Sequence, residues 1–216
     1  MTLSPPNYKI AGSRCVLSFN EPNEAFCKAL AASKLFGGTT ITNSFMNISF
    51  YAKSISSLRD HLSRRREKLQ YIECVRMAQH LGQQLFYLEK CRYTFSWFNL
   101  DNVLVIDDTF FLYVGLEQLK SIDAAGRICF TTPFSSKQPH LAPEIKRLYI
   151  LPSYVTYKAA YYSLGSLITS CLIDADMEAN DQSCKNMLEP IAHTKLYWFL
   201  LRCFHAEPGA RILLFI

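Results

Sequence analysis

The sequence has no closely spaced pair of cysteines. Its eight cysteines are widely separated and lie mostly among apolar neighbours, and no CxxC pattern occurs. None of the five histidines lies at ligand spacing from a cysteine or a carboxylate, so the sequence gives no support for a zinc site. The opening residues MTLSPPNYKI lack the features of a signal peptide. We therefore expect reduced thiols in a cytoplasmic or nuclear protein.

The chain also lacks a long apolar run. The longest, from Ala159 to Ile173, contains serine, threonine and glycine, and it is shorter than the roughly 18 to 20 residues that span a membrane. This run predicts a buried helix, and we expect no membrane span. No internal repeat or low-complexity stretch is present, which argues against a solenoid and against a disordered scaffold.

Positive charge is only slightly in excess of negative charge. The net charge is +5 and the sequence pI is about 8.7. Basic residues are scattered except for Arg64, Arg65 and Arg66, which we interpret as the solvated face of a helix. An acidic partner is the alternative for this run, and nucleic acid is the less favoured partner. With 216 residues, half of them apolar, the chain can form one sizeable core or two small lobes that share a cleft.

Hydrophobic periodicity and turn residues predict an α+β protein. We expect strands within 8–19, 47–53, 102–106 and 109–114, and helices at 21–36, 71–90, 157–173 and 185–205. A short helix that opens near Ser57 carries the arginine run. The segment 115–143 has a loop-like composition. The order is a small, partly stranded piece, a hairpin and then mainly helices.

Seven short motifs occur in one order along the second part of the chain. They are SISSLRDHL, QQLFYLEK, FSWFNLDNVLV, LYVG, LAPEI, AYYSLGSLI and EPGAR. Their order and distances resemble those of the eukaryotic protein-kinase fold over residues 47 to 216. The resemblance implies a protein-kinase-like α+β fold, with a reduced, partly stranded N-terminal lobe at 1–53 and a mainly helical C-terminal lobe at 54–216. An unrelated α+β domain that carries these motifs by chance is the alternative.

The resemblance places the motif FSWFNLDN on the catalytic loop, which in the family reads His-Arg-Asp and ends in a metal-binding asparagine. Asn102 matches that asparagine, and counting back five positions reaches Trp97. Phe95 and Ser96 then occupy the histidine and arginine positions. An indole can be neither a base nor an anion, so we expect Trp97 to be a packing residue that closes the site.

The second metal ligand of the family is the aspartate of Asp-Phe-Gly. Alignment on Gly115 puts Tyr113 at that position, where a Mg²⁺ ion needs a carboxylate. Asp107 and Asp108 follow Asn102 too closely to replace it, and we interpret them as a solvated turn.

The nucleotide side of the resemblance is also altered. Only Gly12 precedes the first helix, so the glycine-rich loop is absent, and Ser18 takes the place of the lysine that contacts ATP. Glu21 or Glu24 could match the helix glutamate, but that lysine is missing. We expect no cofactor and no metal; ATP and Mg²⁺ would bind only if the chain were an active kinase.

A structural motif of the family is retained. Ala142, Pro143 and Glu144 match its Ala-Pro-Glu sequence, and the resemblance implies a buried ion pair between Glu144 and Arg211. Ala160 stands where the family has an aspartate that braces the catalytic loop, so we expect that brace to be lost.

These positions favour a pseudokinase that acts as a protein-binding or scaffolding module rather than as an enzyme. The expected partner is a protein, and the candidate surfaces are the Arg64–Arg66 run and the segment 116–141. A divergent Ser/Thr kinase that uses Asn102 and a carboxylate such as Asp101 is the first alternative. A structural component of a larger assembly, for example in a large DNA virus, is the second.

Overall fold

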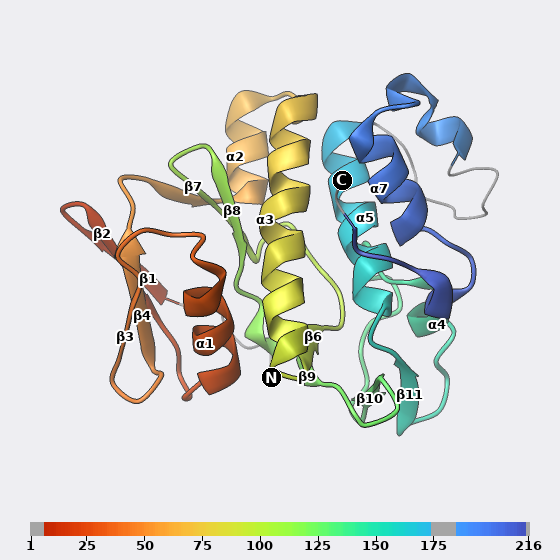
Figure 1. Ribbon diagram of the computed structural model, residues 1–216, viewed down its shortest axis with the longest axis horizontal. Helices are drawn as coiled ribbons and strands as arrows, with labels where there is room; N and C mark the ends of the chain where they lie inside the picture. Colours follow the sequence, from red (N-terminus) through yellow and green to blue (C-terminus); the bar gives the residue numbers. More distant parts are fainter. Residues whose placement is uncertain (1–6, 174–184, 215–216) are drawn as a thin grey trace.

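The computed structural model describes residues 7–173 and 185–214. Its longest helix, α3 (Tyr71–Lys90), runs through the middle of the molecule (Figure 1). A small antiparallel sheet and α1 (Glu24–Ser33) lie on one side of α3, and α5 (Ala159–Leu172) and α7 (Lys195–Cys203) lie on the other. The predicted α+β class is confirmed.

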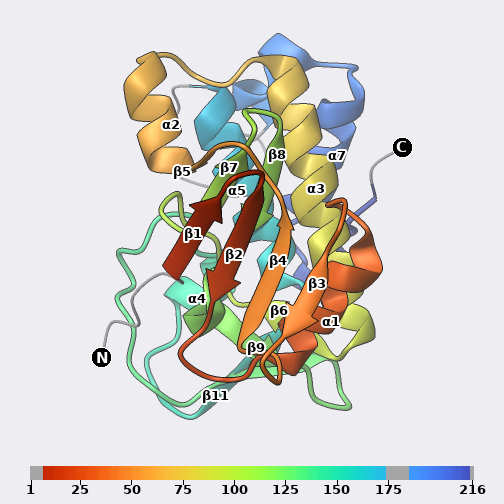
Figure 2. The same cartoon turned by 90° about the vertical axis from the view of Figure 1, so that its left-hand side faces the viewer.

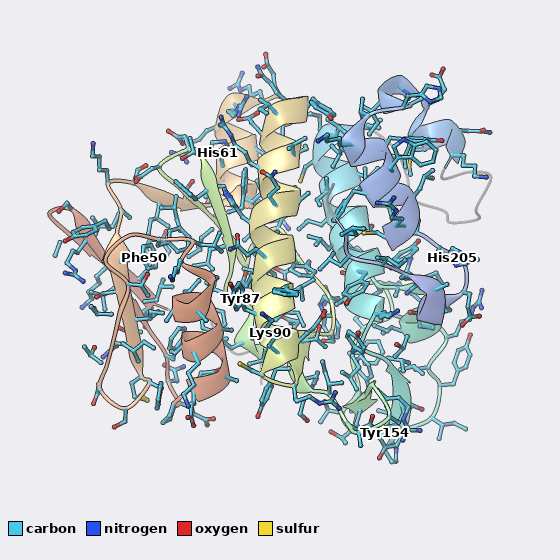
Figure 3. The ribbon with its side chains drawn as sticks, in the orientation of Figure 1. Phe50, His61, Tyr87, Lys90, Tyr154 and His205 are labelled. Atoms are coloured by element: carbon cyan, nitrogen blue, oxygen red, sulfur yellow. The ribbon has the colours of Figure 1, made fainter. Side chains whose placement is uncertain are left out.

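The small sheet has four antiparallel strands. They are β1 (Asn7–Ala11), β2 (Arg14–Ser18), β3 (Thr40–Thr42) and β4 (Asn47–Tyr51), in the order β1-β2-β4-β3 (Figure 2). Alternate residues of β2 and β4 are buried, and Phe50 stacks on Phe36 at 4.6 Å between ring centroids. Figure 3 labels Phe50 on this side of the molecule and His205 on the far side of α3. The sheet thus has its own apolar face, which joins the common core.

The boundaries of the first helix differ from the prediction of 21–36. The side chain of Asn23 accepts a hydrogen bond from the Phe26 amide at 3.1 Å, so the helix begins at Glu24. It ends where Lys34 adopts a left-handed conformation with φ of 53°. The predicted strand 47–53 ends at Tyr51, and the short strand β3 was not predicted.

The predicted hairpin is present. Strands β5 (Ile55–Ser57), β7 (Val103–Ile106) and β8 (Phe110–Tyr113) form a second antiparallel sheet in the order β5-β7-β8. Asp107 and Asp108 turn the chain with φ of 50° and 55°, although no glycine is available. The Asp107 carboxylate also accepts the amides of Lys53 and Ser54, both at 2.8 Å. This aspartate therefore joins the hairpin to the chain that leaves the small sheet.

The interpretation of 115–143 as a loop is partly wrong. It contains the 3-10 turn η1 (Leu116–Gln118) and the strands β9 (Leu119–Ser121) and β10 (Arg127–Phe130). β9 pairs with β6 (Tyr93–Phe95), and β10 pairs with β11 (Ser153–Thr156). Such short strands are stabilised by distant partners rather than by a local pattern, so composition did not reveal them. The short helix α4 (Pro143–Lys146) ends the segment.

Helix α5 packs between α3 and α7, and only its Ser170 and Leu172 are not buried. The predicted helix 185–205 is interrupted: residues 185–187 and α7 are helical, but the residues between them do not continue one α-helix. Residues Glu189–Ile191 form the 3-10 turn η2, and α7 begins at Lys195 after Thr194 accepts the Tyr197 amide at 3.2 Å. His193, with φ of 65°, separates the two.

Two further elements belong to the described part of the fold. Helix α2 (Leu58–Arg65) precedes α3, and the 3-10 turn η3 (Pro208–Ala210) follows α7. Among the helices of the described ranges, none is both long and apolar enough to cross a membrane. Each of the seven described cysteines is a free thiol, as expected.

Candidate functional site

The loop between β6 and β7 meets the turn that follows β8. Backbone hydrogen bonds join them, because the Ser96 amide donates to the Gln118 carbonyl and the Val114 amide donates to the Asn102 carbonyl, both at 2.8 Å. The structure thereby brings together all six positions that the motif comparison selects. They are Phe95, Ser96, Trp97, Asn102, Tyr113 and Gly115.

Tyr113 lies at the centre of this site. Its hydroxyl is 3.1 Å from the Trp97 carbonyl oxygen and 3.0 Å from Gln118 Oε1. Its ring is fully buried against Phe95 and Phe98, with centroids 4.7 and 4.6 Å away. Burial raises the pKa of the Tyr113 phenol well above its usual value, so this side chain stays neutral.

Gln84 of α3 fixes the backbone of Tyr113. Its Oε1 accepts from the Tyr113 amide at 3.0 Å, and its Nε2 donates to the Tyr113 carbonyl at 2.7 Å. Gln84 is a buried polar residue in a helix whose inner face is otherwise largely apolar, which was the signal available in the sequence. The motif comparison did not select it.

Asn102 is hydrogen-bonded to a carboxylate that the motif comparison also missed. Its Nδ2 donates to Glu117 Oε1 at 2.7 Å, and Gln118 Oε1 lies further away at 3.4 Å. The backbone amide of Asn102 donates to Asn99 Oδ1 at 2.8 Å, which fixes the end of the loop. Glu117 is therefore the acidic group that contacts Asn102.

Gly115 is required by close packing rather than by its backbone angles. Its φ is −75°, a value open to any residue. A Cβ atom at this position would lie 2.4 Å from Gln118 Oε1, 2.6 Å from Tyr113 Oη and 2.7 Å from Asn102 Nδ2. The polar groups of the site thus converge on the space that glycine leaves open.

Trp97 packs as expected. Its ring is nearly parallel to that of Phe130, at 6.4 Å and 10°, and lies 5.7 Å from that of Phe134. Phe130 and Phe134 are 5.2 Å apart. This aromatic cluster fastens the 116–141 segment to the loop, so part of that candidate partner surface is used inside the molecule.

The expectation that the loop has lost its helix brace is wrong. Ser163 of α5 is fully buried and its Oγ accepts the Phe98 amide at 2.8 Å. Ala160, the position chosen from the sequence, is buried one turn earlier. The Ser163 hydroxyl contacts the loop backbone, whereas the motif comparison placed this contact at Ala160, one helical turn earlier.

The other acidic candidates lie outside the site. Asp101 forms an exposed ion pair with Arg59, with Arg59 Nη2 3.0 Å from its Oδ2, and this pairing lowers the pKa of Asp101. Asp108 is exposed on the turn and lies 3.6 Å from His61 Nδ1. Neither carboxylate forms a hydrogen bond with the Asn102 side chain in the described part of the chain, and that of Asp101 is paired with Arg59 instead.

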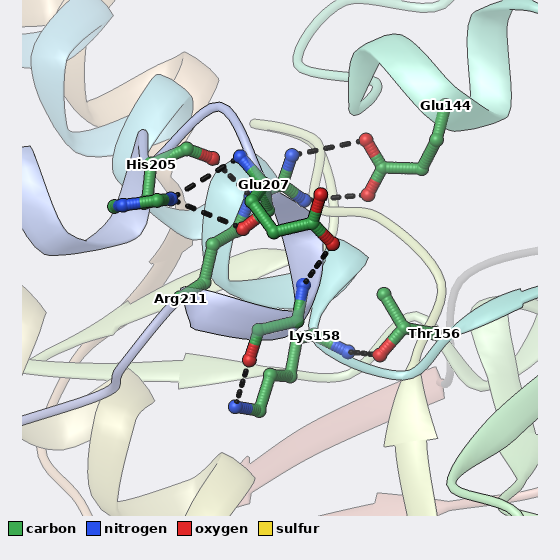
Figure 4. Close-up of polar contacts among 7 residues, drawn as sticks. Glu144, Thr156, Lys158, His205, Glu207 and Arg211 are labelled. Carbon is green, nitrogen blue, oxygen red and sulfur yellow. Dashed lines mark hydrogen bonds and ion pairs between the residues drawn. The ribbon is translucent and has the colours of Figure 1, made fainter.

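The ion pair implied by the retained motif is present (Figure 4). Arg211 Nη2 is 3.0 Å from Glu144 Oε2, and Nη1 contacts Oε1. Arg211 is 1% exposed, its Nε donates to the His205 carbonyl at 3.1 Å, and it lies 5.1 Å from the ring centre of Tyr162. Ala142 and Pro143 start the helix that carries Glu144, as N-cap and first residue. The pair fastens the end of the 116–144 segment to the C-terminal part.

The N-terminal positions show no equivalent site. Ser18 ends β2, and Glu24 forms an exposed ion pair with Lys28 along α1. Gly12 lies in the tight turn between β1 and β2 with φ of 62°, and Glu21 is exposed. Among the described residues, no group of three His, Cys, Asp or Glu side chains could hold a metal ion.

The arginine run is divided by the fold. Arg65 forms an ion pair with Glu73, which joins α2 to α3, and both side chains are largely buried. Arg64 and Arg66 lie on the exposed surface, and Arg66 ends α2 in a left-handed conformation. The predicted solvated face therefore consists of two arginines rather than three.

A comparison of the chain with protein-family models gives no match, and a comparison with curated proteins gives no significant one.

Proposed function

We propose that this chain is a catalytically inactive, protein-kinase-like protein that serves as a protein-binding or scaffolding module. The observation that carries the proposal is the direct hydrogen bond from the Tyr113 hydroxyl to the Trp97 carbonyl, at 3.1 Å. In the family these two positions carry the aspartates that bind metal and orient the substrate hydroxyl. In this chain the neutral phenol of Tyr113 occupies the metal-binding position, and the indole of Trp97 occupies the position that orients the substrate.

The polar groups around these two positions supply one another with hydrogen bonds. Gln118 accepts from Tyr113, Asn102 donates to Glu117, and Gln84 binds both backbone groups of Tyr113. Such a network is stabilised by its own members, because each buried polar group already has a partner. It supports a structural role for the loop.

The lack of the family's catalytic residues, together with contacts that still hold the segment and the loop in place, supports a binding role. The Glu144–Arg211 ion pair and the Ser163 brace hold the 116–144 segment and the loop on the helical part of the chain. A surface fixed in this way loses little conformational freedom when a partner binds. The proposed partner is a protein, and the exposed part of the 116–141 segment is its first candidate surface.

A divergent Ser/Thr kinase is the second candidate function. The observation in its favour is the contact of 2.7 Å between Asn102 and Glu117, which places an amide and a carboxylate side by side. Amide and carboxylate oxygens are ligands that Mg²⁺ accepts. This candidate uses Glu117, and not Asp101, as the acidic group.

Thermal unfolding with millimolar ATP, with and without Mg²⁺, separates the two candidates. The inactive candidate predicts no change in melting temperature that depends on Mg²⁺. A site that binds ATP with Mg²⁺ would stabilise the fold by about 2.7 kcal/mol at a hundredfold excess over Kd. A Mg²⁺-dependent increase that disappears in Glu117→Gln would establish the second candidate and refute the first.

A further inference from the structure

A groove of about 350 Å³ lies between the 136–141 segment and α5. It is separate from the Trp97 and Tyr113 site, whose residues are not among those that line it. Two lysines, Lys137 and Lys146, lie on its walls, and no aspartate or glutamate is among its described lining residues. The groove is therefore concave and positively charged.

One wall of the groove is a row of hydroxyl groups. Tyr162, Ser166 and Ser170 line it from α5. They are four residues apart, so they lie on one face of the helix. Tyr162 and Ser166 are 5% and 2% exposed, which means that this wall is part of the packed core and holds its shape.

His140 also lines the groove, and its ring is hydrogen-bonded to the α5 wall. Its Nδ1 is 2.9 Å from Ser166 Oγ. Burial lowers the pKa of His140 to about 4, which keeps the ring neutral at pH 7.

The two lysines supply the charge. Lys137 and Lys146 are both exposed, and within the described ranges neither forms an ion pair. A carboxylate between them would receive charge-assisted hydrogen bonds, which are about twice as strong as neutral ones. The groove is larger than one such group needs, so an occupant with further atoms is required to fill it.

We propose that this groove binds an acidic peptide segment of a partner protein. A carboxylate of the peptide lies between Lys137 and Lys146, and the His140 ring and the hydroxyl row contact the rest of it. The choice of a protein as partner rests on the proposed function. The groove identifies the chemistry of the bound segment and places the contact at one end of the 116–141 surface.

Fluorescence anisotropy with a labelled hexaglutamate peptide tests the proposal. Labelled hexaglutamine is the neutral counterpart, and a short oligothymidylate of equal charge represents nucleic acid. The test variant is Lys137→Gln with Lys146→Gln. The matched control is Lys9→Gln with Lys195→Gln, which makes the same change of charge at two exposed positions outside the groove.

The proposal expects the parent to bind hexaglutamate more tightly than the other two probes. The groove variant should lose about tenfold in affinity, because two hydrogen bonds to a charged group are removed. The control should change by less than about twofold. Equal losses in both variants would show that the net charge alone attracts the peptide. Tighter binding to oligothymidylate, lost in the groove variant, would assign the groove to a different class of partner; either outcome overturns the proposal.

Acidic residues of the chain itself provide an internal check. Asp174, Asp176, Glu178 and Asp181 lie outside the described residues and could compete for the lysines. A variant with all four changed to the corresponding amides should bind hexaglutamate at least as tightly as the parent. Loss of binding in this variant would contradict the proposal, since the lysines would be unchanged.

The proposed peptide groove and the proposed function would be refuted by different results. Phosphate transfer by the parent would remove the inactive candidate but leave the charge dependence of the groove intact. Absence of hexaglutamate binding by a parent without transfer would remove only the groove.

Discussion

The hydroxyl of Tyr113 lies 3.1 Å from the carbonyl oxygen of Trp97. This contact joins the end of β8 to the loop before β7 by a group that neither carries charge nor binds a metal well. It lies beside Gln118 and under the packed rings of Phe95 and Phe98. The Tyr113 side chain therefore helps to hold the backbone of the loop at Trp97.

Gly115→Ala should destabilise the fold by about 1 to 3 kcal/mol, because the new methyl group would overlap the buried polar atoms of Tyr113, Asn102 and Gln118. Urea denaturation of the variant measures the effect. Gly37→Ala is the matched control, since its Cβ would meet only Tyr51 at 3.8 Å. Equal unfolding midpoints for parent and Gly115→Ala would contradict the packing of the site.

Arg211→Ala should destabilise the fold by about 3 kcal/mol, near the lower end for a buried pair because the Glu144 side chain is 19% exposed. The loss leaves Glu144 without its guanidinium partner. Urea denaturation gives the change, and Lys195→Ala, at an exposed position, should unfold like the parent. If the two variants unfold at the same urea concentration, the ion pair does not hold the 116–144 segment.

Glu89→Gln should change the pH dependence of stability. Burial raises the pKa of Glu89 to about 7, although Tyr161 donates to its Oε2 at 2.9 Å, and Oε1 has no hydrogen bond partner. Because this pKa is above the unfolded value of 4.5, the contribution of the protonated carboxyl is complete below pH 4.5 and is lost as the pH rises through 7.

The free energy of unfolding of Glu89→Gln relative to the parent should therefore increase between pH 4.5 and pH 7, by at most about 3 kcal/mol. His80 and His140 titrate in both proteins, so they cancel in this difference. Glu67→Gln, at an exposed position, is the matched control. A flat difference for Glu89→Gln would mean that its carboxyl ionises as it does in water.

Trp97→Asp should destabilise the fold by about 2 kcal/mol, because it removes the ring that packs on Phe130 and Phe134 and brings a carboxylate beside them. Trp97→Phe retains the aromatic contact and should lose less than half as much. Thermal and urea unfolding of both variants measure this. A fully stable Trp97→Asp protein would show that the position tolerates charge.

Some of the fold could be predicted because its signals are local. The spacing of apolar residues in 71–90 predicts α3, and the apolar runs on either side of Asp107 predict the hairpin. The ion pair of Glu144 with Arg211 was predicted from motif order, although 67 positions separate the two residues.

The rest depends on contacts that sequence patterns do not encode. Gln84 and Tyr113 are 29 positions apart, and Ser163 and Phe98 are 65 apart. Each pair meets only after the helices have packed on the hairpin, so the partners of Gln84 and Ser163 could not be identified beforehand. Glu117 was missed because the motif comparison sought a carboxylate at position 113, whereas the structure places one on the following turn.

Transfer of radiolabelled phosphate from ATP to a generic protein substrate tests the central claim most directly. We predict no transfer above background by the parent, by Trp97→Asp or by Trp97→Asp with Tyr113→Asp, with an active protein kinase as positive control. A single restored aspartate is not expected to rescue activity, because catalytic groups that act together cannot be repaired one at a time. Transfer by the parent that is abolished in Glu117→Gln would contradict the claim and establish Glu117 as the acidic group of an active enzyme.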